Sequence, residues 1–265
     1  MHGFTGTGPI LVLAAHPDDE AAGAGGWIAR CAARGQPPHV LFLTDGAPRQ
    51  RRYFAHGFRG SRAEYRRRRR TEARAAATAL GLPSWHLRFA RIPDLELSAR
   101  LPQGMAHLRT AATATGARIW LVPAGENGHP DHDAANHLAL CAHQEWARGA
   151  ALWEYPLYAW HRGRIRYGWL PPGPDVVTLV LTAAEQAAKA RALAAYTSQQ
   201  NTLAPFWAAL GGEHFRPLRR RAARRSSVWA AWGWQRPAAV EKAPAGAPWA
   251  SVRGSRKQMS ATATL

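Results

Sequence analysis

The chain contains 265 residues, 46% of them hydrophobic, which is enough to bury the core of one large α/β domain. It has no apolar run of about 18 residues that would span a membrane, and its first residues do not resemble a secretory signal. The formal net charge is +18, from 35 Lys and Arg against 17 Asp and Glu, so nucleic acid has to be weighed as a partner.

The basic charge is carried almost entirely by arginine, which clusters over residues 62–74 and 216–225. These clusters contain few aromatic residues that could stack on bases, and no nucleic-acid-binding motif accompanies them. We interpret the arginine content, together with the abundant alanine, as the composition of a GC-rich genome. Nucleic acid is therefore not expected to be the main partner, and no membrane partner is expected either.

Only two cysteines are present, and neither has the neighbours of a nucleophile. Cys31 and Cys141 both lie among Ala and Leu in segments that predict helices. We expect them to be reduced core thiols, which places the protein in the cytoplasm.

The first 46 residues predict a strand, a helix and a second strand. Residues 10–14 form a continuous apolar run, typical of a parallel strand that is covered on both faces. Residues 21–34 predict a helix of small residues that ends at Gly35, and residues 40–44 predict the next strand. The glycines at 23, 25 and 26 do not give the G-x-G-x-x-G spacing at the turn after the first strand, so a dinucleotide cofactor is not expected.

The alternation of strands and helices continues along the chain. The expected elements are a loop over 47–60, a helix over 62–80, a strand over 85–89, a helix over 97–115, a strand over 118–122, a helix over 132–147, a strand over 151–155 followed by a loop, a strand over 175–181 and a helix over 183–196. This pattern predicts one α/β domain over residues 1–241, with a Rossmann-like, mostly parallel sheet flanked by helices. Residues 242–265 lack periodicity and predict a disordered tail.

Two clusters of acidic and histidine residues each follow a predicted strand. Residues 15–20 read Ala-His-Pro-Asp-Asp-Glu, and residues 128–133 read Gly-His-Pro-Asp-His-Asp. The carboxyl ends of parallel strands line the ligand crevice of an open sheet, so we expect the two clusters to converge on one metal ion. The alternative is two ordinary solvated turns, because Asp and Pro are common in turns. Two copies, each at a strand end, favour the metal site.

The two clusters contain the residues that metal-assisted hydrolysis requires. His16, Asp19 and His132 supply three ligands, which suits zinc or ferrous iron with one position left for water. Asp18 is placed to take a proton from metal-bound water. His129 can donate a hydrogen bond to a developing oxyanion or protonate a leaving amine, and Asp131 can orient a histidine.

Residues 15–20 and 129–132, in this order of strands and helices, resemble the PIG-L/LmbE family of metal-dependent N-acetylglucosaminyl deacetylases. The similarity extends to residues 44–46, 69–72, 189–199 and 213–215, and so covers roughly residues 8–218. It implies a Rossmann-type sheet and a zinc-dependent N-deacetylase, with ferrous iron as the second metal, that acts on a small amino-sugar substrate. The implied roles are metal ligand for His16, Asp19 and His132, general base for Asp18, and oxyanion or acid residue for His129.

Four residues are candidates for substrate contacts, namely Arg69, Asp45, Glu126 and Asn127. Arg69 lies on the inward-facing stripe of the predicted helix over 62–80, and a buried arginine needs a partner. We expect a structural pair with Glu72 or Asp45 ahead of a direct contact with a sugar hydroxyl or phosphate. Glu126 and Asn127 immediately precede the second cluster and either line the pocket or belong to a solvated loop.

The sequence therefore predicts a metal-dependent amidohydrolase that removes an N-acyl group, first of all acetyl, from an N-acetylglucosamine-type conjugate. An alternative in the same class is an amidase that acts on a thiol-sugar or another secondary-metabolite amide. An alternative in a different class is a basic nucleic-acid-associated protein with a vestigial metal site. The complete set of metal ligands together with Asp18 and His129 disfavours it, because a vestigial site has no reason to keep its base.

Overall fold

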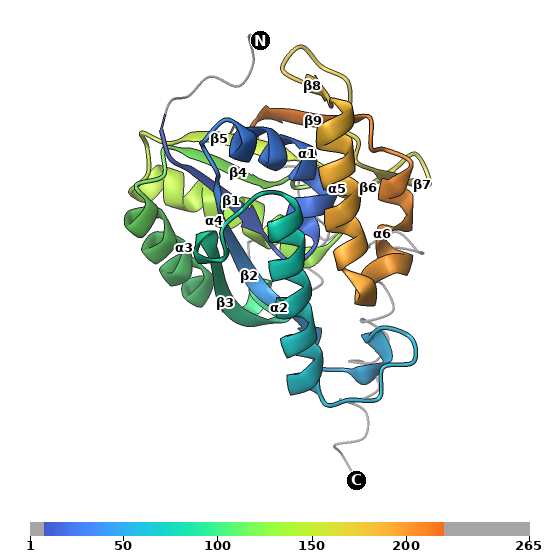
Figure 1. Ribbon diagram of the computed structural model, residues 1–265. Helices are drawn as coiled ribbons and strands as arrows, with labels where there is room; N and C mark the ends of the chain where they lie inside the picture. Colours follow the sequence, from blue (N-terminus) through green and yellow to red (C-terminus); the bar gives the residue numbers. More distant parts are fainter. Residues whose placement is uncertain (1–7, 220–265) are drawn as a thin grey trace.

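The computed structural model of the protein describes residues 8–219 (Figure 1). The predicted tail over 242–265 and the tryptophans at 229, 232 and 234 lie outside the described residues. Within residues 8–219, no helix is long and apolar enough to cross a membrane. Cys31 and Cys141 form no disulfide among the described residues, and both are partly exposed, so the expectation that they lie in the core is wrong.

The main sheet of the described residues has seven strands. In chain order they are β1 (Ile10–Ala14), β2 (His39–Pro48), β3 (Leu87–Asp94), β4 (Ile119–Pro123), β5 (Ala151–Tyr155), β8 (Val177–Val180) and β9 (Gly212–Pro217). Their order across the sheet is β3-β2-β1-β4-β5-β9-β8. The first five strands in this order, β3, β2, β1, β4 and β5, are parallel to one another. Only β9 and β8, at one edge of this sheet, pair in the antiparallel sense. The prediction of a mostly parallel sheet is confirmed.

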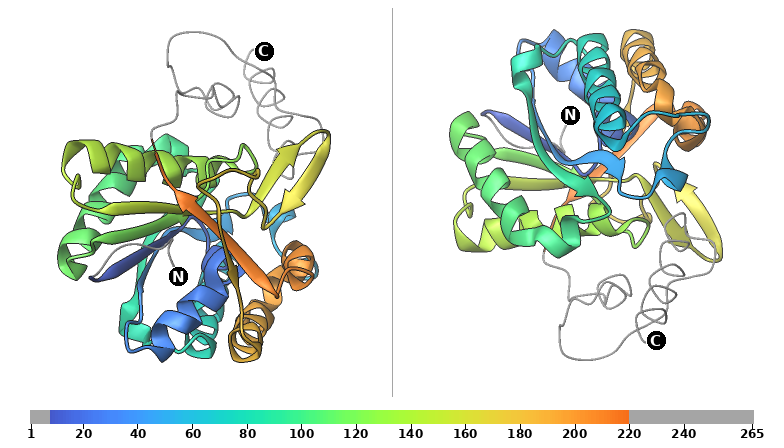
Figure 2. Two further views of the ribbon diagram at one scale, coloured as in Figure 1. Left: turned by 90° about the horizontal axis from the view of Figure 1, so that it is seen from above. Right: turned by 90° about the horizontal axis from the view of Figure 1, so that it is seen from below.

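Helices cover both faces of this sheet (Figures 1 and 2). They are α1 (Asp19–Ala33), α2 (Arg62–Ala79), α3 (Leu101–Thr115), α4 (Pro130–Glu145), α5 (Ala183–Ala195) and α6 (Gln200–Trp207). Alternate residues of β1 face opposite sides: Ile10, Val12 and Ala14 join the core under α1, α2 and α5, whereas Leu11 and Leu13 join the core under α3 and α4. Since β1 lies between β2 and β4, the chain reverses direction across the sheet here, which places a ligand crevice at the carboxyl end of β1.

Three strands and one helix near the C-terminal end of the described residues were not predicted. The loop expected after β5 contains a hairpin of β6 (Tyr158–His161) and β7 (Arg164–Tyr167). Its turn residues, Arg162 and Gly163, both have positive φ, as a tight hairpin turn requires, but arginine is an uncommon residue there. Helix α6 contains Pro205, which weakens a helical pattern, and β9 is an additional strand.

The glycines of α1 are required by close packing against the sheet. A Cβ atom on Gly23 would lie 2.1 Å from the ring of Tyr155, and one on Gly26 would lie 2.2 Å from Leu181. The carboxylate of Glu213 in β9 approaches the same helix and accepts hydrogen bonds from the backbone N–H groups of Gly26 and Trp27, both at 2.8 Å. The glycine-rich segment therefore serves the packing of α1.

We expect Gly23→Ala to lower the free energy of unfolding by about 1–3 kcal/mol, because the added methyl group overpacks the contact with Tyr155. Urea denaturation of the variant and the wild type would measure this. Gly149→Ala is the matched control, since its Cβ would meet no atom within 4 Å and we expect no loss of stability. Equal stabilities of the two variants would contradict the packing argument.

Candidate active site

The structure brings the two predicted clusters together at the carboxyl ends of β1 and β4. Residues 15–20 lead from β1 into α1, and residues 128–133 lead from β4 into α4. The ring of His16 lies 4.5 Å from that of His129 and 5.2 Å from that of His132, between centroids. The expected convergence of the two clusters is confirmed.

Asp19, at the first position of α1, lies between two histidines. Its Oδ1 is 3.2 Å from Nε2 of His132, and its Oδ2 is 3.5 Å from Nδ1 of His16. Burial alone would raise the pKa of Asp19, but the hydrogen bonds and charges of His132 and His16 lower it well below its ordinary range. An ionised carboxylate between two imidazole nitrogens is a suitable donor set for zinc or ferrous iron.

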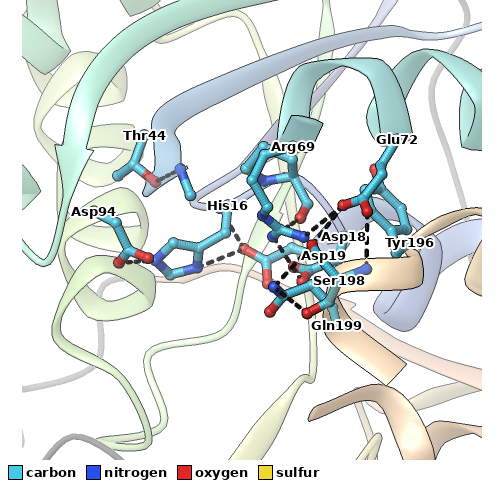
Figure 3. Close-up of polar contacts among 12 residues, drawn as sticks. His16, Asp18, Asp19, Thr44, Arg69, Glu72, Asp94, Tyr196, Ser198 and Gln199 are labelled. Carbon is cyan, nitrogen blue, oxygen red and sulfur yellow. Dashed lines mark hydrogen bonds and ion pairs between the residues drawn. The ribbon is translucent and has the colours of Figure 1, made fainter. Parts of the chain in front are cut away.

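The other ring nitrogen of His16 is held by two carboxylates. Nε2 lies 3.2 Å from Oδ2 of Asp131 and 3.2 Å from Oδ1 of Asp94 (Figure 3 shows Asp94). Asp131 is itself fixed by the backbone N–H groups of Leu95 and Leu97, at 2.7 and 3.1 Å. Metal-binding histidines are commonly oriented in this way, so the contact fits the role predicted for Asp131.

Asp94 is a site residue that the sequence analysis missed. The strand predicted over 85–89 begins at Leu87 and continues to Asp94, so Asp94 also lies at the carboxyl end of a parallel strand. The register of β3 against β2 shifts twice along this stretch. The full length of the strand therefore could not be predicted from a simple apolar pattern.

The site offers more than one way to hold a metal ion. Among the described residues, the potential ligand atoms of two groups lie within 4.8 Å of one another: His16, His129 and His132, and His16, Asp94 and Asp131. Asp19 bridges His16 and His132 within the same cluster. The donors present therefore fit a divalent metal ion, and the ligand set of His16, Asp19 and His132 stays a prediction.

Asp18 is paired with the buried guanidinium of Arg69. Nη2 of Arg69, a residue only 2% exposed, lies 2.9 Å from Oδ2 of Asp18, and it also donates to the carbonyl of Pro17 (Figure 3). Burial raises the pKa of Asp18 to about 6, even though Arg69 beside it acts in the opposite direction. A carboxylate with a pKa near neutrality is well suited to take up a proton.

The prediction of the partners of Arg69 was partly correct. Nη1 of Arg69 lies 3.6 Å from Glu72, as one alternative predicted. Asp45 instead pairs with Arg62 at 2.6 Å, so the alternative that placed it beside Arg69 is wrong. The contact of Arg69 with Asp18 was not predicted, although both residues face the same strand end.

Residues 196–198 support Asp18 from two directions. Tyr196 donates to Glu20, whose other carboxylate oxygen accepts from the backbone N–H of Asp18 at 3.1 Å. Glu72, which holds Arg69, accepts from the backbone N–H and the hydroxyl of Ser198 at 2.8 and 2.6 Å (Figure 3). The backbone of Asp18 has φ 132°, an uncommon conformation that persists only where its surroundings determine it.

His129 precedes the first turn of α4 and caps it. Its Nδ1 accepts a hydrogen bond from the backbone N–H of Asp131 at 3.1 Å, so the ring hydrogen of the neutral form lies on Nε2. Burial and the neighbouring His16 and His132 lower the pKa of His129 well below its ordinary value. His129 is therefore a neutral ring that can donate a hydrogen bond from Nε2.

Glu126 and Asn127 have partners within the protein. Oε2 of Glu126 accepts a hydrogen bond from the backbone N–H of Leu157 at 2.9 Å. The backbone N–H groups of Glu126 and Asn127 both donate to the carboxylate of Asp133. Their contact with a substrate stays a prediction. Tyr158, on the unpredicted hairpin, was missed, and its ring lies 5.2 Å from that of His132.

We expect Ser198→Ala to lower the free energy of unfolding by about 2 kcal/mol, because its hydroxyl donates to the charged Glu72. The variant should also lower turnover, since Glu72 holds Arg69. Chemical denaturation and an activity assay would measure the two effects. Ser98→Ala is the control, because the Ser98 hydroxyl is buried without a hydrogen-bond partner among the described residues. Similar behaviour of the two variants would count against the network.

Comparison with known proteins places the site in context. The family model described as PIG-L: GlcNAc-PI de-N-acetylase matches residues 11–143, about half of the chain. A similar protein from Rhodococcus opacus (strain B4), 1D-myo-inositol 2-acetamido-2-deoxy-alpha-D-glucopyranoside deacetylase, is 28% identical over 242 residues, covering 74% of this chain and 82% of the relative.

Two solved structures show the same fold. A triple mutant of the deacetylase Orf2 of the teicoplanin biosynthetic pathway has a TM-score of 0.60 at 20% identity, over 79% of this chain and 97% of that chain. The N,N'-diacetylchitobiose deacetylase from Pyrococcus horikoshii has a TM-score of 0.61 at 18% identity, over 79% of this chain and 83% of that chain.

Proposed function

Since this chain belongs to the PIG-L family, GlcNAc-PI de-N-acetylase, we propose that it is a metal-dependent hydrolase that removes the acetyl group from an N-acetylglucosamine-type conjugate. The observation that carries the proposal is the convergence of His16, Asp19 and His132 beside the Asp18–Arg69 pair. The relatives support it by name, because the Rhodococcus opacus protein and the chitobiose enzyme are both deacetylases of acetamido sugars.

We propose that His16, Asp19 and His132 hold the metal ion, with zinc as the first candidate and ferrous iron as the second. A bound ion of this kind polarises an amide carbonyl and lowers the pKa of water. Asp131 and Asp94 orient His16 through its second ring nitrogen, which keeps Nδ1 directed toward Asp19.

Asp18 is the proposed general base. Its carboxylate is directed by Arg69, and its position one residue before Asp19 places it next to the proposed metal site. There it takes the proton of the water that attacks the acetamide carbonyl, and it returns that proton to the nitrogen as the C–N bond breaks, so that acetate and the amine are released. Arg69 acts by positioning, since it binds Oδ2 of Asp18 and leaves Oδ1 for the proton.

His129 is the proposed donor to the oxyanion that forms when the carbonyl is attacked. Its Nδ1 is occupied by the N–H of Asp131, so Nε2 carries the hydrogen that can be donated. The low pKa of this buried ring favours hydrogen-bond donation over the alternative role as the acid that protonates the amine.

Asp18→Asn should lower kcat on an N-acetylglucosamine glycoside by about 100-fold to 10,000-fold, because the amide cannot accept the proton of the attacking water. Bound metal should stay at the wild-type level, as elemental analysis would show. Asp175→Asn is the control, since Asp175 lies on the surface and, within residues 8–219, forms an ion pair with Arg219 at 3.5 Å. A near wild-type rate for Asp18→Asn would show that another group is the base.

The wild-type protein, purified without added metal or a histidine tag, should contain about one zinc or iron ion per chain. His132→Ala should lose this metal because one of the proposed ligands is gone, whereas His143→Ala, near the other end of α4, should keep it. Elemental analysis of the three proteins measures this. A wild-type protein that binds no metal even after reconstitution would overturn the proposed function.

A further inference from the structure

The arginine cluster over residues 62–74 divides into two groups in the structure. Helix α2 carries seven arginines, and four of them form ion pairs: Arg62 with Asp45, Arg67 with Glu64, Arg68 with Glu72, and Arg69 with Asp18. The side chains of the other three, Arg66, Arg70 and Arg74, form no ion pair or hydrogen bond within residues 8–219. We call these three residues the α2 row.

The α2 row lies along one face of the helix. Residues four positions apart are neighbours on a helix surface, and successive members are about 6 Å apart along the axis. Arg66 and Arg74 are exposed, and Arg70 is half-buried. Like charges at this spacing destabilise a helix, and no carboxylate of the described residues pairs with them. The row is therefore suited to an anionic partner outside the chain.

A fourth unpaired arginine joins the row from β3. The register of β3 against β2 shifts between residues 42 and 44, where β3 contains one residue more than β2, and this bulge includes Arg91. Arg91 is exposed and has φ 61°, an uncommon conformation for arginine. Partial desolvation lowers the pKa of Arg70, and so do the positive charges of the other two row members and of Arg91. The bulge thus places Arg91 close to the row.

An exposed aromatic ring lies beyond the end of α2. Trp85, in the short helix η2 (Ser84–His86), is 70% exposed, and its ring packs on that of His86 with 4.0 Å between centroids. Residues 80–84 alone connect α2 to Trp85, and β3 begins two residues later. Helix α2 lies over the edge of the sheet that ends in β3 (Figure 1). Exposed rings of this kind serve as stacking platforms for unpaired bases.

We propose that the α2 row, Arg91 and Trp85 form a surface that binds single-stranded nucleic acid, with the arginines on the phosphates and the Trp85 ring stacked on a base. A line of evenly spaced charges matches a linear chain of phosphates, whereas a membrane surface calls for basic residues spread over a plane. The inference is independent of the proposed function, because none of these residues belongs to the proposed metal ligands, base or oxyanion donor.

The test measures binding of the full-length protein to a labelled oligothymidylate of about 12 nucleotides by fluorescence anisotropy at several salt concentrations. The triple variant Arg66→Gln/Arg70→Gln/Arg74→Gln should bind about tenfold more weakly. Its slope of log affinity against log salt should be less steep by about 2, since each phosphate contact on a single strand contributes about 0.7.

The matched control is the triple variant Arg148→Gln/Arg164→Gln/Arg191→Gln, which removes the same charge from exposed arginines outside this surface. Its affinity should stay within about twofold of the wild type. Equal weakening in the two triple variants would overturn the proposal, because the net charge alone would then explain binding. Thermal unfolding should show that the row variant is at least as stable as the wild type, since it loses like-charge repulsion.

Two single variants test the other parts of the surface. Trp85→Ala should weaken oligothymidylate binding about tenfold and leave binding of inorganic polyphosphate, which has no bases, unchanged. Arg91→Gly should weaken oligothymidylate binding while it stabilises the fold, because glycine adopts φ 61° without strain. Equal loss of both ligands in Trp85→Ala would overturn the stacking contact. Binding to phosphatidylserine vesicles but not to oligothymidylate would overturn the proposal in favour of a membrane surface.

Discussion

The buried guanidinium of Arg69 is the interaction on which the arrangement of the site depends. A charge that is only 2% exposed requires partners, and the structure supplies the carboxylates of Asp18 and Glu72 on either side of it. Removing Arg69 would leave the buried carboxylate of Asp18 without the guanidinium that balances its charge. The ion pair thus joins the turn after β1 to α2 and also directs the carboxylate of the proposed base. Residues 196–198 then hold both ends of this arrangement.

The parts of the site that could be predicted from the sequence follow simple geometric rules. Parallel strands end at the same edge of a sheet, so His16 and His132 could be placed together from the two apolar runs before them. The helical period placed Arg69 on a buried face. Asp94 was missed because register shifts conceal the length of β3. Tyr196 and Ser198 were missed because contacts across more than 120 residues leave no local pattern.

The arginine content has a structural explanation in part. Within the described residues, several arginines form close pairs with carboxylates that join separate elements: Arg30 with Glu185, Arg62 with Asp45, Arg69 with Asp18, and Arg216 with Glu154. A planar guanidinium suits such contacts better than an ammonium group does. Part of the high arginine content therefore joins elements of the fold through ion pairs. The positive charge of these arginines is already paired within the protein and is not available to an anionic partner.

The contact of Glu213 with the middle of α1 has a consequence for the order in which the protein is made. Glu213 binds the backbone of Gly26 and Trp27, and Tyr196 binds Glu20. Helix α1, which begins at Asp19, is therefore stabilised by residues near the C-terminal end of the described chain. During synthesis the first residues of the proposed site emerge from the ribosome before these partners do. A nascent chain that stops short of residue 213 would carry both histidine clusters without the supports of α1. Assembly of the proposed site therefore requires residues that are made late, despite the early position of its first motif.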